Sequence, residues 1–597
     1  MVRGLPKLGN IPLQCYKKRS MTPPKPLRLW PGIALALILA LLRFVLPLVF
    51  PQAMAIAMIG ALVAAFGIFV WWLFFSRAPG SERVIPILLM ALALLANSRL
   101  IHPSIQNGMM GMMFFIFAIP VLALALVAWA LAASRLSSPA RWLALVSAVL
   151  LACAPFTLLR TGGITGEGNS DLHWRWSQTP EQKLLTQAAG KIIKPATPLP
   201  SSSSSATEQT PPEWPGFRGA NRDAIIHGVR IQSDWLNSPP VQLWRRPIGP
   251  GWSSFAVQGD LLYTQEQRGD DEIVSCYKLS TGDPVWQHID AVRFWESNAG
   301  PGPRATPTLS NGRLYTFGAT GILNALDPHT GAVAWSRNVA AETETKVPGW
   351  GFASSPLVID DVVIVAACGK LAAYDVSTGE PRWTGPKHGG SYSSPHRLMI
   401  DGVTQIILLN AAGATSVAPT NGATLWQYDW RGVAMVQPAV AADGDLLIST
   451  TGDTGGLGMR RLSVTNESGR WTVKEHWTSS GLKPYFNDSV IHKSHAYGFD
   501  GSLLACINLL DGKRKWKGGR YGNGQLILLA DQDLLLVLSE QGELVLVGAN
   551  PDEFKEIARF PAIKGKTWNH PALINNILLV RNGEEMAAFR LASVSNL

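Results

Sequence analysis

The feature that most constrains the fold is a glycine that stands four residues before a tryptophan and recurs along the C-terminal part of the chain. Five segments share this ending: STGDPVW (280–286), HTGAVAW (329–335), STGEPRW (377–383), TNGATLW (420–426) and LDGKRKW (510–516). Glycine adopts positive φ at no steric cost, so each segment predicts a tight turn followed at once by a strand that ends at the tryptophan.

Short apolar or alternating runs precede each ending, as in 312–327 and 361–375, and they indicate consecutive antiparallel strands. A repeat of about 40–50 residues with about four strands is typical of a β-propeller. One four-stranded sheet cannot bury both of its faces, whereas blades stacked around an axis bury them, with a tryptophan filling each gap. The sequence therefore predicts an all-β propeller.

We count eight units, the seventh of which lacks the Gly–Trp ending and the last of which is one strand short. The segment VQLWRRP (241–247) resembles the missing strand, and we expect it to close the ring by pairing with the last blade. The units cover 249–288, 289–338, 348–385, 389–430, 432–480, 483–520, 521–562 and 566–592.

The N-terminal part predicts a membrane domain of about five transmembrane helices. Hydrophobic residues make up 47% of the chain and charged residues only 16%, and residues 30–159 carry few charges. A helix of ~20 apolar residues crosses the hydrocarbon core of a bilayer. The expected spans are 30–50, 53–75, 84–101, 109–132 and 142–159.

Lysine and arginine are concentrated in alternate connections between these spans, beginning with the tail before the first one. Positively charged loops stay in the cytoplasm. We therefore expect the N-terminus inside a bacterial cytoplasmic (inner) membrane and the propeller on the periplasmic, extracytoplasmic side. Met1 and Met21 are both candidate start sites.

Four domains follow from these patterns. A short surface helix is expected within 171–186, where Thr179, Pro180 and Gln182 form a capping box. The stretch 194–213, rich in Ser and Pro, predicts a flexible tether. The domains are a basic tail (1–29), a transmembrane region (30–160), a helix with a Ser/Pro-rich linker (161–213) and the propeller (214–597).

The repeat ending D-x-x-T-G-x-x-x-W resembles that of pyrroloquinoline-quinone (PQQ) β-propellers, and 327–335 and 375–383 match it fully. The opening WPGFRGANRD (214–223) is also similar to the start of PQQ-like bacterial repeat proteins. This family includes quinoprotein alcohol and glucose dehydrogenases and the noncatalytic propeller of the outer-membrane β-barrel assembly lipoprotein. The resemblance implies an eight-bladed PQQ-like propeller, with either role open.

Each innermost strand is expected to begin near the propeller axis with a polar triplet, so the triplets would surround one channel mouth. Convergent cations and amides there suit a small anionic or polyol ligand, such as the three carboxylates of PQQ. Alternatively, these polar residues bond neighbouring backbone groups and water. The channel-mouth candidates are Arg304, Lys483, Asn487, Asp488, Arg520, Asn523, Lys566, Asn569 and His570.

Asp488 is the candidate general base, although a lone Asp beside Asn is more often a hydrogen-bonded turn residue. No metal site is expected: five scattered cysteines make no zinc motif, and His492 and His495 would point to opposite faces of a strand. A net charge of +10 is explained mainly by the N-terminal tail, which disfavours nucleic-acid binding.

The favoured function is a membrane-anchored, noncatalytic scaffold that binds a ligand or an envelope protein partner. The alternative is a quinoprotein dehydrogenase that uses PQQ with calcium to oxidise alcohols or sugars and passes electrons to membrane quinone. The resemblance implies that such an enzyme has long insertions and usually a pair of adjacent cysteines, and this chain has no Cys-Cys pair.

Overall fold

The protein is described by a computed structural model, which covers residues 27–50, 53–166, 168–188, 211–452 and 455–594. The first 26 residues and most of the predicted tether lie outside these described residues. The chain divides into two compact units. The first comprises residues up to 101 together with 113–158, and the second comprises 102–112 and everything from 159 onward.

The first unit is a bundle of helices. Its elements are α1 (Trp30–Ala40), η1 (Leu41–Val45), α2 (Leu46–Val49), α3 (Met54–Val70), η3 (Trp71–Phe75), α4 (Gly80–Asn97), α6 (Met113–Ala133) and α7 (Ser138–Leu158). Four helices in the described part of the chain are long and apolar enough to cross a membrane: Trp30–Val49, Ile56–Phe75, Met113–Ala133 and Ser138–Leu158. They match four of the five predicted spans.

The remaining predicted span, 84–101, corresponds to α4, which is not among these four and which carries Glu82 in its first turn. Helix α4 lies beside α7 along its whole length. At one end Arg141 forms an ion pair of 2.6 Å with Glu82, and at the other Asn97 donates to the carbonyl of Cys153 at 3.1 Å. Thus α4 lies along most of the length of the apolar α7.

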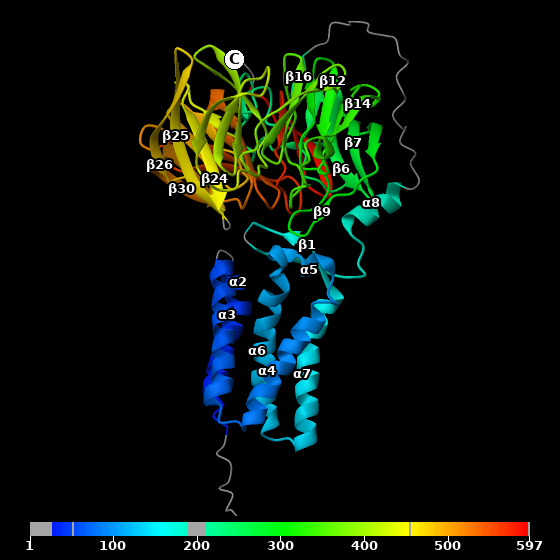
Figure 1. The fold of residues 1–597 in the computed structure, drawn as a ribbon, viewed down its shortest axis with the longest axis vertical. Helices are drawn as coiled ribbons and strands as arrows, with labels where there is room; N and C mark the ends of the chain where they lie inside the picture. The colour runs from blue at the N-terminus through cyan, green and yellow to red at the C-terminus, as the bar shows by residue number, and fades with distance from the viewer. Residues whose placement is uncertain (1–26, 51–52, 167, 189–210, 453–454, 595–597) are drawn as a thin grey trace, which may run out of the picture. The chain divides into compact units, whose positions relative to one another are not determined.

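The second unit contains eight blades (Figure 1), as the repeats predicted. Seven of them are four-stranded sheets, and blade 7 gains a fifth strand, β3 (Ile225–Ile226). Within each blade, neighbouring strands in the chain pair antiparallel, so the blades are built from local hairpins. The strands of blades 1 to 4 are β5 (Ala256–Gln258), β6 (Leu261–Arg268), β7 (Asp271–Lys278), β8 (Pro284–Asp290); β11 (Thr308–Ser310), β12 (Arg313–Phe317), β13 (Ile322–Leu326), β14 (Val333–Asn338); β15 (Leu357–Ile359), β16 (Val362–Ala367), β17 (Lys370–Asp375), β18 (Pro381–Thr384); β19 (His396–Ile400), β20 (Val403–Asn410), β21 (Gly413–Val417) and β22 (Thr424–Asp429).

Blade 5 differs from the others by its long outer hairpin, β25–β26. The strands of blades 5 to 8 are β23 (Ala439–Val440), β24 (Leu446–Gly452), β25 (Gly455–Glu467), β26 (Arg470–Ser479); β27 (Val490–His492), β28 (His495–Asp500), β29 (Leu503–Asn508), β30 (Arg514–Arg520); β31 (Gln525–Leu529), β32 (Leu534–Leu538), β33 (Glu543–Gly548), β34 (Glu556–Pro561); β35 (Ala572–Ile574), β36 (Ile577–Arg581), β37 (Glu585–Arg590) and β4 (Val241–Pro247).

Strand β4 closes the ring, because it pairs antiparallel with β37 as the outermost strand of blade 8. This confirms the prediction for 241–247. Arg581 of blade 8 reinforces the seam: its buried guanidinium donates to the carbonyls of Gln265 at 2.8 Å and Gly249 at 3.1 Å in and beside blade 1.

The Gly–Trp endings act between blades. Trp286 of blade 1 donates its indole N–H to the carbonyl of Pro328 in blade 2, at 2.9 Å. Gly331, in the turn that follows Pro328, lies against the same indole. Trp244 of the closing strand donates its indole N–H to the carbonyl of Leu279 in blade 1, and Gly282 lies against the indole. The junction that closes the ring therefore has the same two contacts as the junction between blades 1 and 2.

The opening segment 214–224 crosses the propeller instead of joining one blade. Trp214 forms a β-bridge with Val257 of blade 1, and the carbonyl of Ala224 accepts from Leu528 of blade 7 at 2.9 Å. Directly after it, β3 (Ile225–Ile226) pairs parallel with β31. The segment therefore carries Arg218 and Arg222 into the centre of the propeller, where both are buried.

The remaining elements of the second unit are short. Strands β1 (Leu159–Ile164) and β2 (Ser170–Trp174) form a hairpin, so 171–174 is a strand where the sequence predicted the start of a helix. Helix α8 (Pro180–Ala188) begins later, and Thr179 and Gln182 form the predicted reciprocal capping box. The others are α5 (Pro103–Gln106), η4 (Gly108–Gly111), β9 (Trp295–Glu296), β10 (Gly300–Pro301), α9 (Val339–Glu342) and η5 (Ala530–Gln532).

Candidate functional site

The third residues of the polar triplets form a belt of hydrogen bonds around the channel. In each link the backbone N–H of one blade donates to the side-chain oxygen at the same position of the next blade. The links are Ser254 to Thr306 (3.0 Å), Thr306 to Ser355 (3.0 Å), Ser355 to Ser394 (2.9 Å), Ser394 to Gln437 (3.2 Å) and Gln437 to Asp488 (2.6 Å). These side chains fasten blades 1 to 6 to one another.

Asp488 therefore ends the belt. Its carboxylate is buried and also lies 3.5 Å from Arg218 Nε and 3.6 Å from His570 Nε2. Burial raises the pKa of Asp488, while Arg218 and the Gln437 N–H oppose the rise. Burial lowers the pKa of His570 to about 3, and Arg218 contributes in the same direction. His570 is thus neutral at physiological pH.

The two candidate asparagines of the triplets also bond neighbouring backbone. Asn487 donates to the carbonyl of Gly524 at 3.0 Å. Asn569 donates to the carbonyls of Gly251 at 3.2 Å and Ser253 at 2.7 Å, across the seam between blades 8 and 1. Both amides are buried and join adjacent blades.

A second group of candidates surrounds Lys566. Its ammonium lies 5.3 Å and 4.5 Å from the ring centroids of Trp252 and Trp568, and it donates to the carbonyls of Asn298 at 3.1 Å and Ile164 at 3.4 Å. Burial lowers the pKa of Lys566 to about 8. The two indoles are themselves in contact, with centroids 4.9 Å apart.

Arg304 is likewise fully engaged with its own chain. Its guanidinium donates to the carbonyls of Gly302 and Gly300, each at 2.8 Å, and lies 3.3 Å from Glu296 Oε1. Burial lowers the pKa of Arg304 to about 10, against the effect of Glu296.

Glu540 is the main residue that the sequence reasoning missed. Its Oε1 accepts from Trp568 Nε1 and from the Gly166 N–H, each at 2.8 Å, and its Oε2 accepts from the Asn523 N–H at 3.1 Å. Glu540 lies in the turn between β32 and β33, where acidic residues are common. The local sequence therefore gave no indication that its carboxylate would bond three distant groups.

The β1–β2 hairpin lies against this mouth. Besides the contacts of Ile164 and Gly166, the Ile164 N–H donates to the carbonyl of Asn298 at 3.0 Å. Asn298 Oδ1 in turn accepts from the Met109 N–H at 3.3 Å. A Cβ on Gly166 would fall 1.2 Å from Asn523 Nδ2, so glycine is required for this close approach. The β1–β2 hairpin of the same chain therefore occupies part of this mouth.

The other two candidates have contacts within blade 6. Lys483 Nζ lies 4.0 Å from Asp500 Oδ1, and Arg520 donates to Ser502 Oγ at 2.6 Å. The nine candidates thus fall into four groups. Asp488 lies in the belt with His570 beside it, and Asn487 and Asn569 join adjacent blades through backbone carbonyls. Arg304, Asn523 and Lys566 lie at the mouth, and Lys483 and Arg520 contact residues of blade 6. Among the described residues, no group of three or more His, Cys, Asp or Glu is placed to hold a metal ion.

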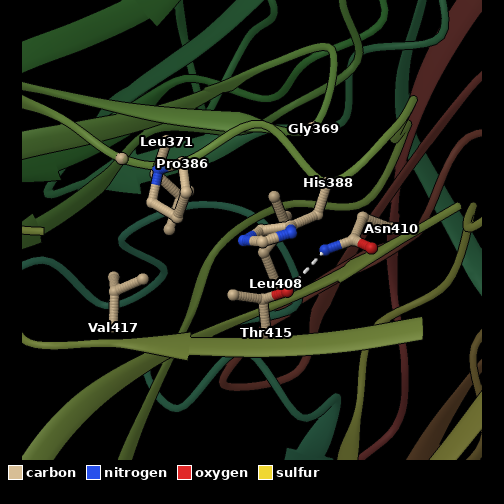
Figure 2. Close-up of a pocket in the computed structure, with 9 residues that line it drawn as sticks. Gly369, Leu371, Pro386, His388, Leu408, Asn410, Thr415 and Val417 are labelled. Atoms are coloured by element: carbon tan, nitrogen blue, oxygen red, sulfur yellow. Dashed lines mark hydrogen bonds between the residues drawn. The ribbon is translucent and has the colours of Figure 1, made fainter. Parts of the chain in front are cut away.

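Two hollows lie between blades away from the mouth. The smaller, of about 10 Å³, lies between blades 3 and 4 and is lined by His388, Asn410 and Thr415 among others. Figure 2 shows these side chains and the hydrogen bond of 2.9 Å from Asn410 to Thr415. It has room for about one water molecule.

The larger hollow is an open groove of about 570 Å³ between the outer strands β22 and β26. Residues 425–429 line one side, and Trp471 and Val473 contribute to the other. The Trp430 N–H donates to Ala412, so by the alternation of an antiparallel ladder Gln427 directs its N–H and C=O away from β21. The groove therefore exposes an unpaired strand edge.

Comparison with known proteins relates the blades to a family. Residues 289–518 match the family model described as "Outer membrane protein assembly factor BamB". The BamB of Yersinia pestis is 27% identical over 154 residues, which are 24% of this chain and 36% of that protein. The BamB of Shewanella oneidensis is 31% identical over 109 residues, which are 17% of this chain and 25% of that protein. The match thus spans about a third or less of these relatives.

Solved structures align with part of this chain at low sequence identity. BamB from Moraxella catarrhalis aligns with a TM-score of 0.43 and 16% identity, over 60% of this chain and 99% of that one. A quinohemoprotein alcohol dehydrogenase from Pseudomonas putida aligns with a TM-score of 0.45 and 12% identity, over 64% of this chain and 81% of that one. The second unit is thus an eight-bladed β-propeller, part of which matches the BamB family model, and several apolar helices precede it in the chain.

Proposed function

We propose that this protein is a noncatalytic scaffold, anchored in the bacterial cytoplasmic membrane, whose propeller binds an envelope protein. The observation that carries the proposal is that the two cations at the mouth, Lys566 and Arg304, already donate hydrogen bonds to backbone carbonyls of this chain. Lys566 donates to Asn298 and Ile164, and Arg304 bonds two carbonyls beside Glu296. A site that recognises an anionic cofactor needs cations with unsatisfied donors.

PQQ fits this arrangement poorly. Its three carboxylates would compete with backbone carbonyls that already satisfy Lys566 and Arg304, and the hairpin residue Gly166 bonds the carboxylate of Glu540. Asp488, the candidate base, accepts from the Gln437 N–H and lies beside Arg218 in the belt. These contacts support a structural role for the residues that a quinoprotein would use.

A quinoprotein dehydrogenase is the second candidate, because Trp252 and Trp568 present indole faces beside a cation. The test uses the full chain purified in detergent, with PQQ and calcium added, and measures binding by calorimetry and dye reduction with alcohols and aldoses. We expect no saturable binding at micromolar PQQ. Binding with turnover that is lost in Asp488→Asn, but retained in the exposed control Asp531→Asn, would establish the enzyme instead.

We further propose that an extended segment of the partner adds to the edge of β22 in the groove. Strand addition takes its affinity from backbone hydrogen bonds and its specificity from side-chain pockets. Leu425 and Trp471 offer apolar contacts there, and Arg460, 4.3 Å from the Trp430 centroid, donates to the Tyr428 hydroxyl at 2.7 Å beside it.

The experiment places a photo-crosslinker at Gln427 in the membrane-bound protein and identifies any adduct by mass spectrometry. A defined envelope protein should be captured there and not from the exposed Leu510 of blade 6. Gln427→Pro removes an outward N–H without breaking the ladder to β21, so it should abolish the adduct formed from a neighbouring position, whereas Gln427→Ala should retain it. Equal capture by both variants would refute strand addition.

For topology, we propose that α4 is a fifth membrane span. It lies beside α7 from the ion pair of Glu82 with Arg141 to the contact of Asn97 with Cys153, and its 18 residues compare with the 21 of α7. Five crossings put the propeller on the side opposite the N-terminus, in the periplasm. Cysteine accessibility at Ser81 and at Ser98 in intact cells tests this, because the two positions should then be labelled from opposite sides.

A further inference from the structure

The centre of the propeller holds two buried arginines from the opening segment. Arg222 is 8% exposed and donates to the carbonyls of Pro356 at 2.7 Å and Ser355 at 3.0 Å. Arg218 is 3% exposed and donates to the carbonyls of Asp223 at 2.9 Å and Ser489 at 3.0 Å. Both guanidinium groups thus bind neutral backbone acceptors.

The charges around them do not balance. Asp488 is the one carboxylate at ion-pair distance from Arg218 in the described part of the chain, and no described carboxylate forms an ion pair with Arg222. His396 and His570 add no negative charge, and burial with the neighbouring arginines lowers the pKa of each to about 3. Two cations therefore face one anion in the protein interior. An uncompensated buried charge costs several kcal/mol.

Several donors in this cluster also lack acceptors. Within the described residues, Arg222 Nε and Arg218 Nε are buried and have no hydrogen-bond partner, although Arg218 Nε lies near Asp488. The buried Nδ1 of His396 is likewise without a partner there, and it is a donor in the tautomer that carries the proton on Nδ1. Buried N–H groups are nearly always paired with protein, water or an ion. An anion bound here would thus accept hydrogen bonds from these unpaired groups.

The backbone that delivers the arginines is in a costly conformation. Arg218, Arg222 and Ala224 have φ of 62°, 59° and 60°, in the left-handed region that non-glycine residues rarely adopt. Such conformations are energetically costly and persist only where the surroundings fix them. The segment is therefore held in the orientation that turns both guanidinium groups into the propeller.

We propose that Arg218, Arg222 and His396 form a channel site for a small monovalent anion such as chloride, which completes the charge balance of Arg222. The ion would join the opening segment to the inner ends of blades 3 and 4. Because it binds the folded protein, it stabilises the closed propeller by mass action. This site is separate from the Lys566 mouth and does not depend on the scaffold function.

The test compares thermal unfolding of the full chain in detergent in sodium chloride and in sodium gluconate at equal ionic strength. Gluconate is a much larger anion than chloride, and a site for a small anion should prefer chloride. Chloride should therefore raise the melting temperature by roughly 2–4 °C, and the rise should saturate. Arg222→Gln should abolish the difference. The matched control Arg382→Gln, which removes an exposed arginine paired with Asp361 and Asp375, should retain it.

A second measurement is independent of the variant's folding. Crystals grown with bromide should show an anomalous scattering peak beside Arg222 at millimolar bromide. A peak there together with the chloride-specific stabilisation supports the site. Ordered water only at this position, or equal responses to chloride in wild type and Arg222→Gln, would overturn it.

Discussion

Gly331 of blade 2 lies directly against the indole of Trp286 in blade 1: a Cβ on this glycine would fall 2.4 Å from Trp286 Cε3. The same glycine has φ of +74°. One position therefore meets two demands, a left-handed turn and a flat surface for the neighbouring blade's tryptophan. This explains why a glycine and a tryptophan recur in these endings while the residues between them vary, since each glycine meets the tryptophan of the preceding blade.

Gly331→Ala should destabilise the propeller by about 2–4 kcal/mol, because it adds left-handed strain and a steric overlap with Trp286. The matched control is Gly259→Ala, whose glycine has φ of +58° but open space where the Cβ would lie. In that control, only the left-handed strain should lower the free energy of unfolding, by about 1–2 kcal/mol. Chemical unfolding followed by tryptophan fluorescence measures both, and equal losses would contradict the role assigned to the indole contact.

Trp244→Ala should weaken ring closure. The buried indole of Trp244 joins β4 to blade 1 through the Leu279 carbonyl, so its loss should cost about 3–5 kcal/mol. Deleting 241–247 should abolish cooperative unfolding of the propeller altogether. Calorimetry checks both, with the exposed Trp176→Ala as control, and an unchanged transition after the deletion would refute closure by β4.

Acid should destabilise the fold through His396. Burial, with Arg222 and Arg218, lowers the pKa of His396 from 6.5 to about 3. Between these values the unfolded chain binds a proton that the folded protein does not, so stability falls as pH falls, by up to about 1.4 kcal/mol per pH unit. His396→Gln removes this contribution. Urea unfolding at pH 7 and pH 5 should show a smaller loss in the variant, and identical losses would contradict the assignment.

Gly166→Ala should release the β1–β2 hairpin from the mouth, because the new Cβ overlaps the Asn523 amide. An isolated two-stranded hairpin is marginally stable, so hydrogen exchange across 159–174 should rise about tenfold or more. Adding Asn523→Ala removes the overlap and should restore protection. Protection that is unchanged in the single variant would show that the hairpin is not held by this contact.

The sequence predicted the blades well because each repeat encodes a local hairpin and one inter-blade contact. Even the pairing of 241–247 with the last blade could be inferred, since that segment carries the tryptophan that blade 8 lacks. The mouth could not be predicted in the same way. Glu540 and Asn298 gain their roles from distant segments, and 159–174 carries no repeat that links it to the propeller.

The nine candidate residues show the same division. The triplet positions were found because strand starts are readable, but their partners depend on how neighbouring blades are rotated. Asp488 and Gln437 are 51 positions apart and meet only across a blade junction. Lys483 and Arg520 lie near triplets in the chain, yet they contact Asp500 and Ser502 of blade 6.

The belt needs a side-chain oxygen atom at one position in each of blades 2 to 6, and different side chains can supply that atom. Serine, threonine, glutamine and aspartate all serve in this one chain. Related propellers are therefore free to exchange these residues without loosening the ring. At these positions, related propellers should be compared by the geometry of their hydrogen bonds, because a comparison of residue identities would show little similarity.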